Sequence, residues 1–106
     1  MSDGVNPGAM GGDPFEAIDP RLNVFALANG MDLNKGSGFR RLEWFTEGLE
    51  RGILIEADGD GGFRLGVLSW PTGSTEITAR TLVGSGLTGE DVIGRLQTAI
   101  DAANEL

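Results

Sequence analysis

Apolar and polar residues alternate through the middle of the chain, which is the pattern of half-buried β-strands. Three runs rich in β-branched and large apolar residues cover residues 53–57, 63–70 and 75–83. Turn-forming residues separate these runs at 58–62 and 71–74. Short strands joined by turns that contain Gly, Asp and Pro form antiparallel hairpins. The pattern therefore predicts a three-stranded antiparallel meander.

A hairpin loop at 58–62 fixes the register of the first two predicted strands. One face of the sheet then pairs apolar residues only: Ala57 with Phe63, Ile55 with Leu65 and Ile53 with Val67. The other face places Glu56 opposite Arg64, and an opposite-charge pair favours the same register. Two independent features of the sequence thus predict one alignment.

Apolar residues at helical spacing flank this sheet on both sides. We expect helices at about 20–29, 38–51 and 89–104. The second has an apolar stripe of Phe39, Leu42, Phe45 and Leu49, and the third begins with a capping box of Thr88 and Asp91. A small sheet needs helices on its apolar face, so we expect an α+β fold with helices mainly on one side.

Residues 1–12 contain four glycines and a proline without apolar periodicity, and we expect a flexible tail there. The remaining residues, 13–106, fit one domain. The chain shows no basic and apolar leader segment and no apolar run of membrane-spanning length. We therefore expect a cytoplasmic protein with no membrane partner.

The net charge and the residue types of the chain narrow the range of possible functions. Sixteen acidic against eight basic residues give a net charge of −8, which repels phosphate backbones, so we expect no nucleic-acid partner. The chain has no His, Cys or Tyr, which removes the usual general base and thiolate chemistry. We expect a non-enzyme without cofactor or metal.

The loop Asp58–Gly62 begins like a calcium loop, but its twelfth position is Ser69, and we interpret it as a hairpin turn.

The predicted element order from Phe39 onward resembles that of double-stranded-RNA-binding domains. Such domains need a basic start to the last helix, where this chain has Gly89, Glu90 and Asp91. The charge of those residues argues against RNA binding. The chain is also similar in size, charge and predicted composition to small acidic secretion chaperones, a resemblance that implies a dimer binding unfolded segments.

One candidate site is the loop before the predicted helix 38–51, where Lys35, Ser37, Arg40 and Arg41 gather. A helix N-terminus with added cationic donors favours an anion, so this loop suggests a binder of phosphorylated metabolites, with weak catalysis as a further option. The alternative interpretation is that Ser37 caps the helix and that the arginines pair with nearby acids.

The other candidate site is the sheet face opposite the predicted core, which carries Leu54, Leu68 and Trp70 among charged residues. An apolar centre with a charged rim is typical of a protein interface. Two interpretations remain open: a free interface, or a second core layer covered by the N-terminal helix. Our preferred hypothesis is a non-enzymatic interaction module, homodimeric through this face or a sheet edge. A third hypothesis is an acidic chaperone or inhibitor of a basic client.

Overall fold

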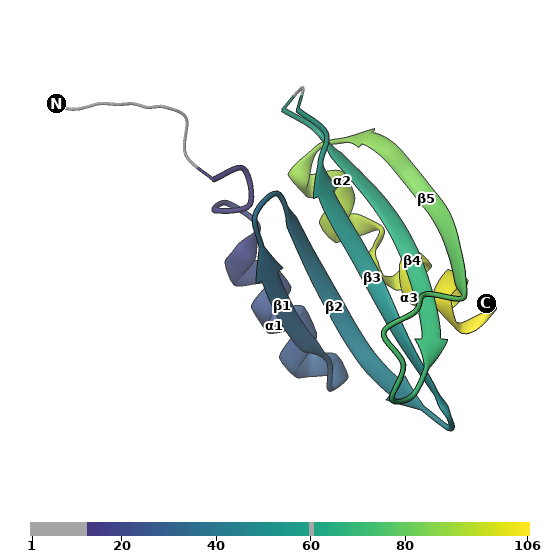
Figure 1. Ribbon diagram of the computed structural model, residues 1–106. Coiled ribbons are helices and arrows are strands. Elements are labelled where there is room, and N and C mark those ends of the chain that lie inside the picture. Colours follow the sequence, from purple (N-terminus) through teal and green to yellow (C-terminus); the bar gives the residue numbers. More distant parts are fainter. Residues whose placement is uncertain (1–12, 60) are drawn as a thin grey trace, which may run out of the picture.

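The computed structural model describes residues 13–59 and 61–106 (Figure 1). The predicted tail at 1–12 lies outside the described residues. The elements follow in the order α1 (Asp19–Asn29), β1 (Asp32–Gly36), β2 (Phe39–Thr46), β3 (Leu49–Ala57), β4 (Phe63–Pro71), β5 (Ala79–Leu87), α2 (Gly89–Gly94) and α3 (Leu96–Asn104).

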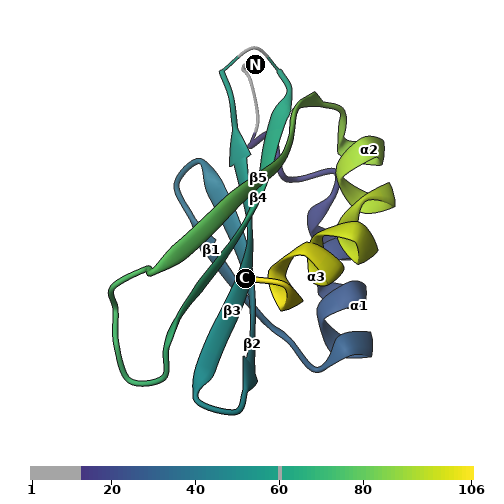
Figure 2. The ribbon, with the colours of Figure 1, turned by 90° about the vertical axis from the view of Figure 1, so that its right-hand side faces the viewer.

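The five strands form one antiparallel sheet in the order β1-β2-β3-β4-β5, so each strand pairs with its neighbour in the chain. All three described helices lie on the same side of this sheet (Figure 2). α1 packs against β1, whereas α3 packs against β3, β4 and β5. The predicted α+β class is confirmed.

The predicted three-stranded meander is wrong, because the sheet has five strands. The segment 38–51, predicted as a helix, forms β2 and the start of β3. A hairpin turn joins these strands, and Gly48 adopts a left-handed φ of 80° that a tight turn requires. The strand β1 was also missed. With no helix at 38–51, the resemblance in element order to double-stranded-RNA-binding domains disappears.

The remaining boundaries shift in smaller ways. The predicted third strand, 75–83, is found at Ala79–Leu87, and the residues before it form a loop. The predicted helix 89–104 is divided at Arg95 into α2 and α3. The predicted first helix, 20–29, agrees closely with α1.

Two detailed predictions are confirmed. The β3–β4 register pairs Ala57 with Phe63, Ile55 with Leu65, Ile53 with Val67 and Glu56 with Arg64. The Thr88 side chain accepts a hydrogen bond from the Asp91 amide at 3.0 Å, and the Asp91 carboxylate accepts one from the Thr88 amide at 3.1 Å. This reciprocal capping box begins α2.

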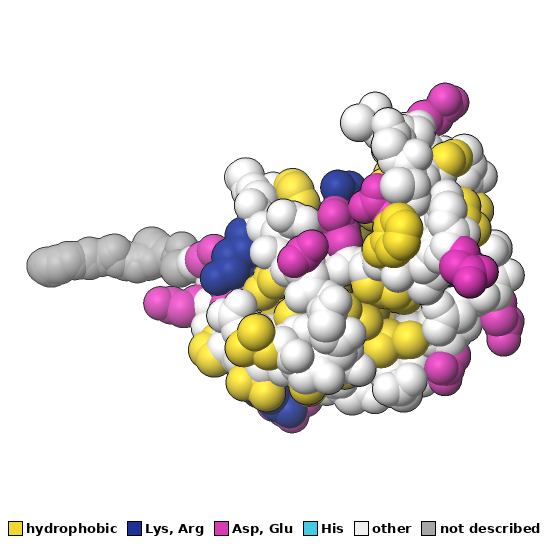
Figure 3. All heavy atoms as spheres, turned by 90° about the horizontal axis from the view of Figure 1, so that it is seen from below, with side chains coloured by type: hydrophobic (Ala, Val, Ile, Leu, Met, Phe, Trp, Pro, Cys, Tyr) yellow, Lys and Arg dark blue, Asp and Glu magenta, His cyan; other side chains and the backbone are white. Residues whose placement is uncertain are grey.

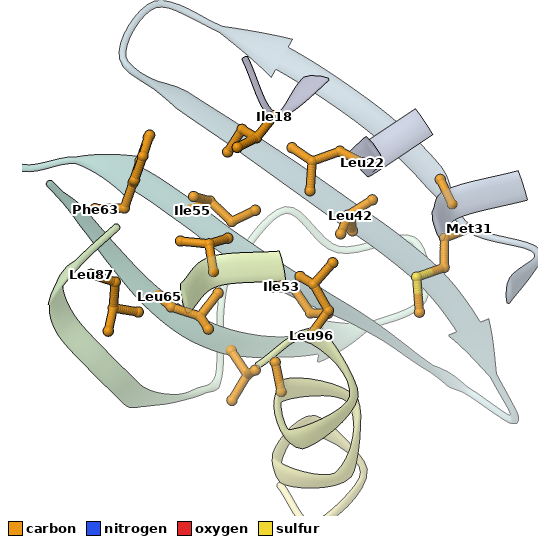
Figure 4. Packing of buried hydrophobic residues seen from close by; sticks show 14 of the residues in the cluster. Ile18, Leu22, Met31, Leu42, Ile53, Ile55, Phe63, Leu65, Leu87 and Leu96 are labelled. Atoms are coloured by element: carbon orange, nitrogen blue, oxygen red, sulfur yellow. The ribbon is translucent and has the colours of Figure 1, made fainter. Parts of the chain in front are cut away.

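The hydrophobic core fills the space between the sheet and the helix layer (Figure 4). The sheet contributes alternate residues of its central strands, among them Leu42, Ile53, Ile55, Leu65 and Val67, all fully buried. The helical side contributes Phe15, Ile18, Leu22, Val92 and Leu96. Alternation sends the intervening strand residues to the opposite side of the sheet, which we call the outer face.

Candidate functional site

The predicted anion-binding loop lies in the β1–β2 hairpin and not at a helix N-terminus. Lys35 belongs to β1, where it pairs with Arg40 of β2, and Ser37 lies in the connecting turn. The side chains of Lys35 and Ser37 are exposed. No helix dipole therefore points at this loop, and the main physical reason to expect an anion there is gone.

Arg40 is buried, and its five N–H donors are all used within the protein. Its Nε and one terminal nitrogen donate to the Asp19 carboxylate at 2.9 and 3.0 Å, and the same terminal nitrogen donates to Asp13 at 2.9 Å. The other terminal nitrogen donates to the carbonyl oxygens of Gly36 at 3.0 Å and Phe39 at 2.8 Å. A guanidinium has five donors, so none remains for a bound anion.

This buried cluster ties the N-terminal turn and α1 to the edge of the sheet. The Arg40 guanidinium also lies 4.4 Å from the centre of the Phe15 ring. Hydrogen bonding by Asp19, and then by Asp13, raises the pKa of Arg40 above its usual value. Arg40 therefore stays charged and has a structural role.

Arg41 projects from the opposite side of β2, because neighbouring strand residues point to opposite faces. Its guanidinium pairs with Glu43 and lies 5.3 Å from the centre of the Trp70 ring. The structure therefore separates Arg40 and Arg41, and does not bring the four predicted anion-binding residues into one site.

The outer face carries all three residues of the predicted interaction site, Leu54, Leu68 and Trp70. No helix of the described chain lies on this side of the sheet (Figure 2). The N-terminal helix α1 packs on the core side against β1, so it does not cover these residues. Of the two interpretations left open by the sequence, the structure supports a face without a helical cover.

Two of the predicted residues are nevertheless buried by their neighbours. Leu68 is 3% exposed and Trp70 is 7% exposed, whereas Leu54 is half-buried. The Trp70 ring covers Gly52 on the adjacent strand, since a Cβ atom built at Gly52 would lie 3.3 Å from two ring atoms. The segment 72–78 passes along this side of the sheet as well (Figures 1 and 2). The large apolar residues that this face exposes are Phe45, at 63%, and Leu82, at 60%.

A groove of about 340 Å³ lies on the outer face across β3, β4 and β5. We call it the Gly66 groove, because Gly66 lies at its middle, between Leu54 of β3 and Leu82 of β5 in the sheet register. Its other lining residues include Glu56, Arg64, Leu68 and Arg80. The groove thus combines an apolar floor with charged residues at its rim. Figure 3, viewed from below, shows that the sheet side of the molecule is hollowed and holds charged side chains.

A second hollow, of about 440 Å³, lies on the helix side. It is lined almost entirely by α1 and by Ile93 of α2: Pro20, Arg21, Val24, Phe25, Ala28 and Ile93. Val24 and Leu27 of α1 are 68% and 84% exposed. Hydrophobic side chains gather on this side in the lower part of Figure 3. This hollow has one charged residue, whereas the Gly66 groove has three.

Gly52 was interpreted as the end of the predicted helix 38–51 and Gly66 received no role, whereas both lie inside strands, Gly52 in β3 and Gly66 in β4. An isolated glycine in a strand signals a bulge or a close approach of other atoms. At Gly52 this signal marks the close approach of the Trp70 ring, and at Gly66 it marks the approach of the Thr81 carbonyl oxygen beside an irregular β4–β5 register.

Within the described residues, no group of three or more Asp or Glu side chains is placed to hold a metal ion. None of the described helices has the length and apolar character needed to span a membrane. Comparisons with protein-family models, curated proteins and solved structures found no match to this chain.

Proposed function

We propose that this protein is a non-enzymatic binding module that docks a protein partner on the outer face of its sheet. The observation that carries the proposal is the one-sided helix layer, which leaves the opposite sheet face without a helical cover. An antiparallel sheet readily faces water on one side, but then that side is normally polar. Here it exposes Phe45 and Leu82 and has a groove lined by both apolar and charged residues.

The distribution of residues on this face resembles that of a protein interface. Leu54 and the exposed Leu82 form an apolar centre above the buried Leu68, and Arg64 and Arg80 lie around it. Interfaces typically have an apolar core with Trp and Arg enriched and a polar rim. Self-association through this face, giving a homodimer, is one form that such docking takes.

The other two hypotheses have less support. The five donors of Arg40 are occupied, which argues against an anion site at Lys35–Arg41. A basic client would meet Arg64 and Arg80 at the rim of the groove, and like charges oppose such a complex.

The test compares Leu82→Asp, on the outer face, with Leu27→Asp, on the helix side. Both leucines are exposed, at 60% and 84%, so neither substitution removes a core side chain. Each variant and the wild type would be used to capture partners from native extract, and light scattering would measure their masses. Thermal unfolding followed by circular dichroism would verify that all three proteins are folded.

We expect Leu82→Asp to lose the partners, or the dimer, that the wild type and Leu27→Asp retain. An aspartate in place of this leucine removes apolar contact area and must lose its hydration in the complex, which is unfavourable. Identical partners and mass for Leu82→Asp and the wild type would refute the proposal. Loss of binding in Leu27→Asp alone would place the interface on the helix side.

A further inference from the structure

Two glycines of the outer face, Gly52 in β3 and Gly66 in β4, differ in the side chains that surround them. At Gly52 the missing side chain is replaced by the ring of Trp70, two atoms of which lie 3.3 Å from an ideal Cβ position. At Gly66 a similar Cβ would have a single described neighbour within 4 Å, the Thr81 carbonyl oxygen at 3.3 Å. The protein thus covers Gly52 with its own tryptophan ring, whereas no side chain lies against Gly66 and its one close neighbour is a backbone oxygen.

The sheet register makes the vacancy at Gly66 into a defined hollow. Leu54 and Leu82 are its partners on the two adjacent strands, so three neighbouring positions read Leu, Gly, Leu across the sheet. Directly opposed residues in antiparallel strands are about 5 Å apart, so two leucines flank a position that has no side chain. Leu68, two residues further along β4, closes one end of this hollow.

The rim of the hollow is cationic in a chain whose net charge is −8. Arg80 is paired with Leu68 across β4 and β5, and its exposed side chain makes no hydrogen bond or ion pair with the described residues. The Arg64 Nε lies 3.4 Å from the Glu56 carboxylate. The four N–H donors on the two terminal nitrogens of Arg64 make no hydrogen bond with the described residues. A guanidinium beside an apolar floor is suited to a carboxylate, which it binds through two parallel hydrogen bonds.

We propose that the Gly66 groove is a specificity subsite for one large aliphatic or aromatic side chain of an acidic partner segment. That side chain occupies the vacancy between Leu54 and Leu82, and a neighbouring Asp or Glu of the segment pairs with Arg80. The inference rests on the proposed function, because it names the chemistry of the segment that the outer face docks.

The experiment is selection from a library of random displayed peptides on the full chain, followed by affinity measurements on the enriched sequences. Gly66→Leu fills the hollow with the side chain that the partner would supply. Arg80→Glu reverses the charge of an exposed residue and leaves the apolar floor in place. Arg95→Glu, which reverses an exposed arginine between α2 and α3, is the matched control.

We expect the wild type to enrich peptides that combine a large apolar residue with a nearby Asp or Glu. Gly66→Leu should weaken their binding by about tenfold or more, which is the scale of one aliphatic side chain returned to water. Arg80→Glu should select basic in place of acidic flanking residues, and Arg95→Glu should select the same peptides as the wild type. Because Arg80 is a surface residue, this reversal of selection is measurable even if Gly66→Leu is poorly folded.

An unenriched library, or peptides that bind a folded Gly66→Leu as tightly as the wild type, would overturn the inference. Selection of the same acidic peptides by Arg80→Glu would overturn it as well. If Leu82→Asp loses native partners while Gly66→Leu and Arg80→Glu keep them, the outer face docks a partner but the subsite is wrong. If Leu82→Asp also keeps them, the proposed function itself is refuted.

Discussion

Replacing Arg40 with methionine should destabilise the protein strongly, although the residue lies near the end of strand β2. Methionine keeps an apolar stem of similar length against the Phe15 ring, so the substitution mainly removes the charge and the five donors. The Asp19 carboxylate, whose side chain is 17% exposed, then loses its ion-pair partner. The Asp13 side chain is 53% exposed, so its carboxylate is hydrated more easily than that of Asp19 after the arginine is removed.

The magnitude follows from these exposures. Breaking a buried ion pair by removing one partner costs about 3–5 kcal/mol, because the remaining charge stays buried. The Arg40 side chain is 5% exposed, but both carboxylates reach water in part, so we expect the lower end, about 3 kcal/mol. At roughly 4 °C per kcal/mol for a domain of this size, the melting temperature should fall by about 12 °C.

Arg21→Met is the matched control. Arg21 also links α1 to a distant element, since it lies 2.6 Å from the Glu90 carboxylate of α2, but the two side chains are 48% and 81% exposed. A surface pair of this kind contributes at most about 1 kcal/mol. Urea unfolding followed by circular dichroism would measure both variants, with an unchanged m-value showing that the native state is intact.

A double variant separates the ion pair from general packing. Asp19→Asn in the Arg40→Met background removes the buried unpaired charge, so the double variant should be more stable than Arg40→Met alone. If Arg40→Met cost no more than Arg21→Met, Arg40 would not be a structural residue. The argument against an anion site at this arginine would then fail.

Three further predictions test other parts of the structure. The Phe15 amide, and then the Arg40 guanidinium, hold the pKa of the Asp13 carboxyl below its ordinary 3.8. The stabilising effect of the ionised carboxyl is therefore lost as the pH falls through this lowered value. Asp13→Asn should make the free energy of unfolding depend less on pH in that range, which acid unfolding would measure. Gly52→Ala should displace the Trp70 ring and cost about 1–3 kcal/mol, measured by urea unfolding; a more stable variant would contradict this contact. Thr88→Ala should cost about 1 kcal/mol by removing the cap of α2, whereas Thr88→Ser should retain stability.

The sequence predicted correctly those features that depend on neighbouring residues or on one hairpin. The register of β3 and β4 follows from the alternation of Ile53, Ile55, Leu65 and Val67 across a short turn, and the structure confirms it. The capping box of Thr88 and the end of α1 at Gly30 are likewise local signals. Such features need no knowledge of the rest of the fold.

The helix predicted at 38–51 failed because its residues satisfy two patterns at once. Phe39, Leu42, Phe45 and Leu49 are spaced for a helical stripe, yet Leu42 and Trp44 also alternate with charged residues as a strand requires. The decision between these patterns is made by partners outside the segment. β1 pairs with β2 along one edge and β3 pairs along the other, and a local periodicity does not contain that information.

The candidate site was predictable only in outline. Alternation correctly assigned Leu54, Leu68 and Trp70 to the face opposite the core, but not their exposure. The Trp70 ring packs over Gly52 of the adjacent strand, a contact that strand alternation does not contain. The Gly66 groove also depends on the β4–β5 register, which contains an irregularity between Leu65 and Gly66 that no sequence pattern indicated.

The error over 38–51 bears directly on function. A helix there would have been available to cover the second sheet face, and the apolar residues of that face would then have had a structural explanation. As strands, the same residues widen the sheet and add Phe45 to the outer face. The described helices pack on one side, so Leu54, Leu82 and Phe45 have no helix to bury them. Apolar residues on both faces of a sheet favour a cover on each side, and the proposed docking of a partner would supply the second one.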